Sequence, residues 1–110
     1  MADTYKYVQG DTGPQIKVTI TDADGSPVDL TSGTVTLHFR AAGTTTLLFS
    51  RPLVITTANQ TNGVALLQWA SGDLDIDAGN YEGEIETVTA TGQRETQYSL
   101  LKFKIREDFA

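Results

Sequence analysis

The sequence predicts an all-β protein, an immunoglobulin-like antiparallel β-sandwich of about seven to nine strands. Turn-forming residues recur about every ten positions, and they separate short segments in which apolar and polar residues alternate. No stretch repeats its apolar residues with a helical period. Residues 77–83, DAGNYEG, have the pattern of a tyrosine corner, which such sandwiches place where strand F begins.

The predicted tyrosine corner consists of Asp77, Gly79 and Tyr81. A small acidic turn enters a strand, and we expect the ring of Tyr81 to fold beneath the bend. Its hydroxyl should then donate to an upstream backbone carbonyl. Gly83 and Ile85 follow Tyr81 on the inward face of the same strand. We expect this buried bend to hold the two layers of the sandwich together.

Alternation predicts where the strands run and which side chains point inward. The expected strands cover residues 5–9, 15–21, 34–40, 45–50, 53–57, 64–69 and 81–89, with a last strand after a turn at 91–93. Their inward positions include Ile16, Val18, Ile20, Val35, Leu37, Phe39, Ala65, Leu67 and Trp69.

Two positions interrupt the regular pattern. Pro52 has no N–H to donate, so it should lie at a sheet edge or begin a new strand. In the last strand, Tyr98 and Leu100 share one parity, whereas Phe103 and Ile105 share the other. A slip of one residue turns every side chain to the opposite face, so we expect a β-bulge near residues 100–101.

Composition limits the function classes. The 110 residues form a single domain, 1–110, in which residues 1–9 are either a docking arm or an edge strand. The absence of cysteine excludes disulfides and thiolate chemistry, and it favours folding in a reducing cytosol. The net charge of −6 argues against a nucleic-acid partner. Neither a signal peptide nor an apolar run of about 20 residues is present, so no membrane partner is expected.

An acidic series is the one candidate for a metal site. Its spacing matches positions of a calcium-binding loop, and its members are Asp73, Asp75, Asp77 and Glu84. The position that needs glycine for the sharp turn is Ala78, and no helices flank the series. A structural role is therefore favoured, with Leu74 and Ile76 pointing into the sandwich; calcium binding stays the alternative.

No pattern predicts catalysis. His38 is the only histidine, it points outward in mid-strand, and no nucleophile or orienting carboxylate has matching spacing. We therefore expect no catalytic residues and no cofactor. Glu82, Glu84 and Glu86 form an outward row, with Glu82 opposite Lys102 if the turn at 91–93 sets the register. The row is either a solvated face or a docking surface for a basic partner.

The aromatic residues are the remaining candidates for a surface. Trp69 shares its parity with apolar neighbours and should belong to the core. Tyr5 and Tyr7 pack at the sheet edge or contribute to an interface with a partner. A carbohydrate site would need an exposed aromatic ring beside amide or acidic groups. Tyr5, Tyr7 or Tyr98 would supply the ring.

Several segments, in order along the chain, resemble a phage family. They are Gly10-Asp11, residues 24–31 (DGSPVDLT), residues 35–40 (VTLHFR), Asn62-Gly63-Val64, Trp69 and residues 78–83 (AGNYEG). The set resembles the immunoglobulin-like module at the N-terminus of siphophage baseplate upper proteins, which also occurs as small stand-alone phage proteins. The resemblance covers residues 8 to 106.

The resemblance implies a non-catalytic virion structural protein, an accessory or adaptor of capsid, neck or tail. Such a protein docks onto other virion proteins in several symmetric copies, and it is assembled in the host cytoplasm. The chain stops at Ala110 without a helical or receptor-carrying extension, which favours an accessory role over a baseplate arm. Addition of residues 1–9 to a partner's sheet is the expected docking mode. The alternative is a module that binds carbohydrate or another host-surface component.

Overall fold

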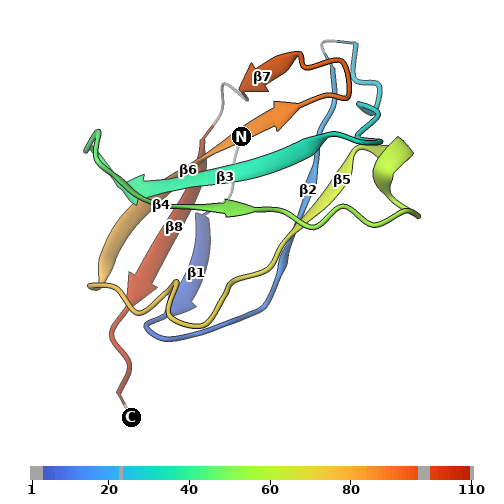
Figure 1. Cartoon of the computed structure of the whole chain (residues 1–110). Coiled ribbons are helices and arrows are strands. Elements are labelled where there is room, and N and C mark those ends of the chain that lie inside the picture. The colour runs from blue at the N-terminus through green and yellow to red at the C-terminus, as the bar shows by residue number, and fades with distance from the viewer. Residues whose placement is uncertain (1–3, 23, 97–99, 110) are drawn as a thin grey trace.

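The protein forms a β-sandwich, which is described from a computed structural model covering residues 4–22, 24–96 and 100–109 (Figure 1). The strands and one short 3-10 helix are β1 (Thr4–Val8), β2 (Ile16–Thr19), β3 (Thr34–Ala41), β4 (Leu47–Pro52), η1 (Gln60–Asn62), β5 (Val64–Leu67), β6 (Gly79–Val88), β7 (Arg94–Thr96) and β8 (Leu101–Arg106).

The strands belong to two sheets of unequal size. The six-stranded sheet has the order β1-β8-β6-β3-β4, with β7 also paired to β6, and β2 and β5 form the second sheet. Every strand pair is antiparallel except β1 and β8, which run parallel (Figure 1). The expectation of a purely antiparallel sandwich is therefore wrong at this edge. β1 and β8 lie at opposite ends of the chain, so no hairpin imposes an antiparallel direction on them.

The core is formed by the side chains that alternation assigned to the inward faces. Phe39 lies at its centre and packs on other aromatic rings, whose centroids are 4.8 Å (Phe49), 5.3 Å (Tyr81), 5.2 Å (Phe103) and 5.8 Å (Trp69) away. Aromatic pairs at such distances contribute about 0.5–1.5 kcal/mol each beyond the area they bury. The other large side chains that are fully buried are Ile20, Leu30, Val35, Leu37, Leu67, Leu74, Thr87, Phe103 and Ile105.

The strand expected over residues 53–57 does not form. β4 ends at Pro52, and beyond it only Val54 makes an isolated bridge, to Leu66 of β5. Leu53 is buried and donates its N–H to the carbonyl of Val35. At this point the chain leaves the large sheet for the small one, so it cannot pair continuously with either (Figure 1).

The last part of the chain pairs with β6 in two registers. Thr96 lies opposite Glu86 and Leu101 lies opposite Gly83. The last part of the chain therefore advances five residues between these two pairs, while β6 advances three. The bulge expected near residues 100–101 belongs to this irregular stretch, but residues 97–99, including Tyr98, lie outside the described part of the chain. Beyond it, Phe103 and Ile105 point inward as expected.

Candidate docking surfaces

The tyrosine corner is present and ties the loop before β6 to that strand. The hydroxyl of Tyr81 donates a hydrogen bond of 2.6 Å to the carbonyl oxygen of Asp77, as the sequence predicts. The ring is buried and stacks on Phe39 at an interplanar angle of 14°. Burial, with a smaller contribution from the Asp77 carboxylate, raises the pKa of Tyr81 above its ordinary value. The corner therefore serves the scaffold and offers no exposed chemistry.

Asp73 fixes the same loop to β4. Arg51 donates from Nε to Asp73 Oδ2 at 2.9 Å and from a terminal nitrogen to Oδ1 at 2.5 Å. Asp73 Oδ2 also accepts the N–H of Ala70 at 2.8 Å. The Asp73 side chain is 8% exposed, so both of its oxygens are committed within the chain. This bidentate pair was not foreseen, because nothing in the sequence connects positions 22 residues apart.

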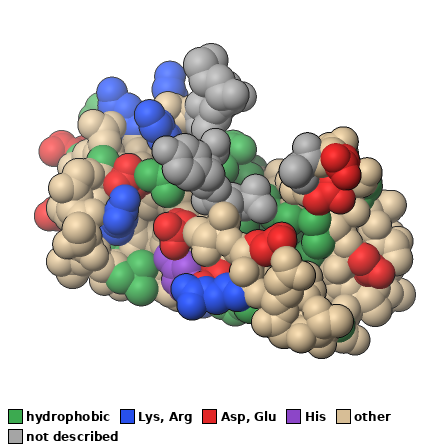
Figure 2. All heavy atoms as spheres, turned by 90° about the horizontal axis from the view of Figure 1, so that it is seen from above, with side chains coloured by type: hydrophobic (Ala, Val, Ile, Leu, Met, Phe, Trp, Pro, Cys, Tyr) green, Lys and Arg blue, Asp and Glu red, His purple; other side chains and the backbone are tan. Residues whose placement is uncertain are grey.

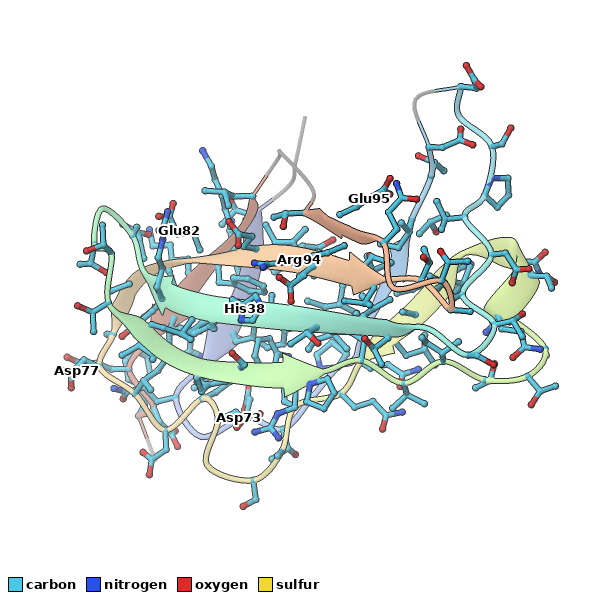
Figure 3. The ribbon with its side chains drawn as sticks, turned by 45° about the horizontal axis from the view of Figure 1, so that its top comes forward. His38, Asp73, Asp77, Glu82, Arg94 and Glu95 are labelled. Atoms are coloured by element: carbon cyan, nitrogen blue, oxygen red, sulfur yellow. The ribbon has the colours of Figure 1, made fainter. Side chains whose placement is uncertain are left out.

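The acidic series does not assemble a metal site. Asp73 and Asp77 lie in the loop before β6, away from Glu82 and His38 (Figure 3). Glu84 is exposed on the outer face of β6, in register with His38. Among the described residues, no three histidine, cysteine, aspartate or glutamate side chains converge on a point where a metal ion would sit. Leu74 is fully buried and Ile76 packs against the core, as the structural interpretation expects.

The outward glutamates of β6 are largely neutralised by their neighbours. Glu82 accepts from Arg40 at 2.9 Å, and it lies opposite Lys102 as expected. Glu86 forms ion pairs with Arg94 and, at 3.5 Å, with His38 (Figure 3). Burial alone would raise the pKa of Glu86, but the hydrogen bonds from His38 and Arg94 outweigh it and lower the pKa. This row therefore gives a basic partner little unpaired charge.

Of the segment 1–9, residues Thr4–Val8 form the edge strand β1, and residues 1–3 lie outside the described part of the chain. Tyr7 is buried, donates to the carbonyl of Pro14 at 2.9 Å and packs edge-on against Trp69 at 5.5 Å. Burial raises the pKa of Tyr7. Tyr5 is half-buried, with its ring 5.7 Å from Phe103. Of the two alternatives for Tyr7, the structure favours packing over an interface, because its parity on β1 carries it into the core beside Trp69.

The outer side of β1 is partly capped. Gln9 donates its N–H to the carbonyl of Arg106 on β8. Because only alternate residues bond across a parallel ladder, the backbone N–H and C=O of Val8 point away from β8. Asp11 fills that position: its carboxylate accepts the N–H of Val8 at 3.1 Å, and its own N–H donates to the Val8 carbonyl. Only Thr4 and Lys6 remain with outward-facing backbone groups. A short strand with a lysine and a cap resists pairing with another strand.

The opposite edge, β4, has no such protection. The bond from Leu53 to Val35 places Arg51 and Phe49 at the paired positions of the ladder, so the backbones of Leu48 and Ser50 face outward. Pro52 ends the strand with no N–H on that side, as expected for a proline at an edge.

The first part of the β4 edge is also apolar and uncharged, and Arg51 and Pro52 follow at the end of the strand. The Leu47 and Leu48 side chains are 50% and 49% exposed, at a register shift opposite Phe39 and Arg40. Residues 44–50, TTTLLFS, contain no charge, proline or glycine. Uncharged segments of high β-propensity at an open edge are the ones that pair with other strands. β4 is therefore the candidate docking edge of this fold, and the sequence analysis did not single it out.

The comparisons with known proteins identify a structure of similar fold but no family to which the chain belongs. No protein-family model matches the chain, and no curated protein matches it. Among solved structures, that of CopC from Methylosinus trichosporium OB3b is similar, with a TM-score of 0.54 and 9% sequence identity over 97% of this chain and 87% of CopC. In the described residues, no helix reaches the length and hydropathy of a membrane-crossing one. The chain thus has an immunoglobulin-like β-sandwich fold, as the sequence predicts.

Proposed function

We propose that this chain is a non-catalytic structural protein of a phage virion, which docks onto other virion proteins through the free edge of β4. The observation that carries the docking mode is the uncharged stretch 44–50 at an edge strand, with Leu47 and Leu48 exposed. The virion assignment rests on the ordered segments between residues 8 and 106 that resemble the phage module. An accessory or adaptor position on capsid, neck or tail, in several symmetric copies assembled in the host cytoplasm, follows from the same resemblance.

Strand addition at β4 explains why the edge is left open. An extended segment of the partner would pair with the outward N–H and C=O groups of Leu48 and Ser50, and its apolar side chains would cover the two leucines. Main-chain pairing supplies affinity, while the alternating side chains of the partner supply specificity. The docking mode is still strand addition, as expected, but the docking strand is β4 at the opposite edge of the large sheet instead of residues 1–9.

A carbohydrate or host-surface module, the alternative function, has weaker support. Such a site needs an exposed aromatic ring beside hydrogen-bonding groups. Tyr7 and Trp69 are buried and Tyr5 is half-buried. Phe109 is 88% exposed, but its ring lies 4.9 Å from the guanidinium carbon of Arg106. No aromatic platform is therefore formed by the described residues.

Blocking the β4 edge tests the proposal. Leu48→Lys places a charge on the docking edge, and Val54→Lys, at a side chain that is 41% exposed, is its matched control. Both substitutions are at exposed positions, so both variants should unfold within about 0.5 kcal/mol of the parent in urea. In the phage that encodes the chain, particles should retain the Val54→Lys protein and lack the Leu48→Lys protein. Particles that carry both equally would overturn the proposal.

A further inference from the structure

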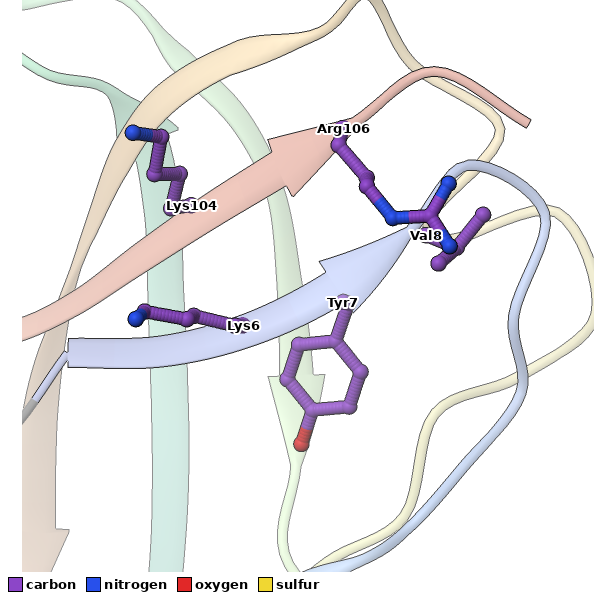
Figure 4. Close-up of a pocket in the computed structure, with 5 residues that line it drawn as sticks. All are labelled: Lys6, Tyr7, Val8, Lys104 and Arg106. Atoms are coloured by element: carbon purple, nitrogen blue, oxygen red, sulfur yellow. The ribbon is translucent and has the colours of Figure 1, made fainter. Parts of the chain in front are cut away.

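Two lysines lie side by side on the outer face of the β1–β8 pair, and no carboxylate among the described residues forms an ion pair with them. Lys6 of β1 is in register with Lys104 of β8, and Val8 is in register with Arg106 (Figure 4). Like charges at directly opposed positions of a sheet are destabilising. Among the described residues, the ion pairs use Arg40, Arg51, Arg94 and His38, and none involves Lys6, Lys104 or Arg106.

The surface between these cations is hollowed. A cavity of about 290 Å³ is lined by Lys6, Tyr7, Val8, Lys104 and Arg106 (Figure 4). Arg106 is held at its rim by a hydrogen bond of 2.8 Å to the carbonyl of Glu107. We call this hollow and its three cations the basic face. It offers charge-assisted hydrogen bonds to carboxylates over an apolar floor.

Unneutralised acidic groups stand at the other end of the molecule. They belong to the segment that joins β2 to β3, and they are Asp22, Asp24 and Asp29, which we call the acidic turn. Each is exposed, and none forms an ion pair among the described residues. Hydrogen bonds from Thr31 lower the pKa of Asp29, so this carboxylate stays charged at neutral pH.

The two surfaces are well separated. In Figure 1 the acidic turn lies at the top, beside residue 23, whereas β1 and β8 run toward the bottom. Figure 2 shows most Lys and Arg toward its left side, interspersed with Asp and Glu, and further Asp and Glu at its right end. Among the described residues, no ion pair joins the basic face of one copy to its own acidic turn.

We propose that the basic face of one copy binds the acidic turn of a second copy. The contact joins two different surfaces, so it is heterologous and repeats head to tail, closing into a ring or continuing as a filament. The proposal deepens the proposed function, on which it rests for the expectation of several copies. At physiological salt the Debye length is about 8 Å, so repulsion between net charges is largely screened while juxtaposed pairs still attract.

Charge reversal at the two ends tests the contact by sedimentation of the purified chain. The basic-face variant is Lys6→Glu with Lys104→Glu, and the acidic-turn variant is Asp24→Lys with Ser26→Lys, which spares the Asp22 carboxylate that accepts the N–H groups of residues 24 and 26. The parent should associate at about 0.15 M salt, where the Debye length is about 8 Å, and dissociate at about 1 M salt, where it is about 3 Å. Each variant alone should raise the dissociation constant about tenfold or more. Lys17→Glu, at an exposed residue of β2, is the matched control and should associate like the parent.

Mixing the variants gives the sharper result. For the mixture the charges are neutralised and not reversed, so that the altered surfaces do not match each other: Lys6→Gln with Lys104→Gln keeps its acidic turn, and Asp24→Asn with Asp29→Asn keeps its basic face. This mixture should form dimers and nothing larger. A parent that stays monomeric at about 0.15 M salt, or variants that associate unchanged, would overturn the proposal. So would binding of a short DNA duplex or a polyglutamate peptide to the basic face of a monomeric parent, since the occupant would then be another molecule. Normal head-to-tail association with no incorporation into particles would instead contradict the proposed function alone.

Discussion

The hydroxyl of Tyr81 lies 2.6 Å from the carbonyl oxygen of Asp77, and this bond closes the loop by which the chain passes from β5 of the small sheet to β6 of the large one. Arg51 fixes the same loop to β4 through Asp73. The tyrosine corner and this ion pair therefore hold one crossing between the sheets. β4 takes part in the ion pair only through the side chain of Arg51, so the outward backbone groups of Leu48 and Ser50 remain available for contacts with other molecules.

Tyr81→Phe should destabilise the protein by about 0.5–1.5 kcal/mol, because the hydroxyl bond is lost while the ring and its stacking on Phe39 remain. Urea unfolding followed by tryptophan fluorescence measures the change. Tyr5→Phe is the control, since its ring is only half-buried and its hydroxyl forms no hydrogen bond within the described part of the chain. Equal stability of Tyr81→Phe and the parent would show that the corner bond contributes nothing.

Gly83→Ala should destabilise the protein by about 1–3 kcal/mol through overpacking. An added Cβ would lie 2.5 Å from Cδ1 of Leu37 and 3.1 Å from Cε2 of Phe103, in the middle of the core. Gly13→Ala adds the same atom where nothing lies within 4 Å, so it should be nearly neutral. Thermal unfolding of both variants checks the difference, and a neutral Gly83→Ala would mean that the core at this position is looser than described.

Asp73→Ala should cost about 1–3 kcal/mol, because it removes the acceptor of the Ala70 N–H and leaves Arg51 without its partner. Asp75→Ala, in the same loop and exposed, is the matched control. Denaturant midpoints compare the two substitutions. If the control lost as much stability as Asp73→Ala, general loosening of the loop would explain the effect better than the ion pair.

Stability should fall at alkaline pH because of two buried tyrosines. The pKa values of Tyr7 and Tyr81 are raised above the ordinary 10.0. The unfolded chain therefore loses these protons at lower pH than the folded one. The stabilisation is complete below pH 10.0 and is lost as pH rises through the folded-state pKa values.

Urea midpoints measured across this range for the parent and for Tyr7→Phe with Tyr81→Phe separate the tyrosine contribution from that of the lysines. The double variant should be less stable at neutral pH but lose less stability between neutral and alkaline conditions. A parallel decline of the two proteins would contradict the predicted linkage.

The local sequence pattern was sufficient to predict the buried core positions and the tyrosine corner. The inward positions of β3, Val35, Leu37 and Phe39, are all fully buried, because alternation on a half-buried strand is a strong constraint. The sequence separation between a tyrosine and its upstream turn is likewise short, so the bond from Tyr81 to Asp77 was predictable.

Contacts between distant segments were not predictable. The pairing of β1 with β8 buries Tyr7, yet no residue near Tyr7 in the sequence indicates that β8 is the strand with which β1 pairs. The same holds for Arg51 and Asp73. Which edge is open depends on the sheet order and on the cap that Asp11 places on Val8. For this reason the candidate docking site moved from residues 1–9 to β4 once the strand order was known.

If the proposed function holds, a phage encodes this chain, and a reconstruction of its particles by electron cryomicroscopy tests the central claim most directly. The account predicts density for repeated copies of the sandwich, with an extended strand of a neighbouring protein paired along Leu48 and Ser50. Particles without the chain, or copies whose β4 edge faces open solvent while another surface makes the contact, would contradict it.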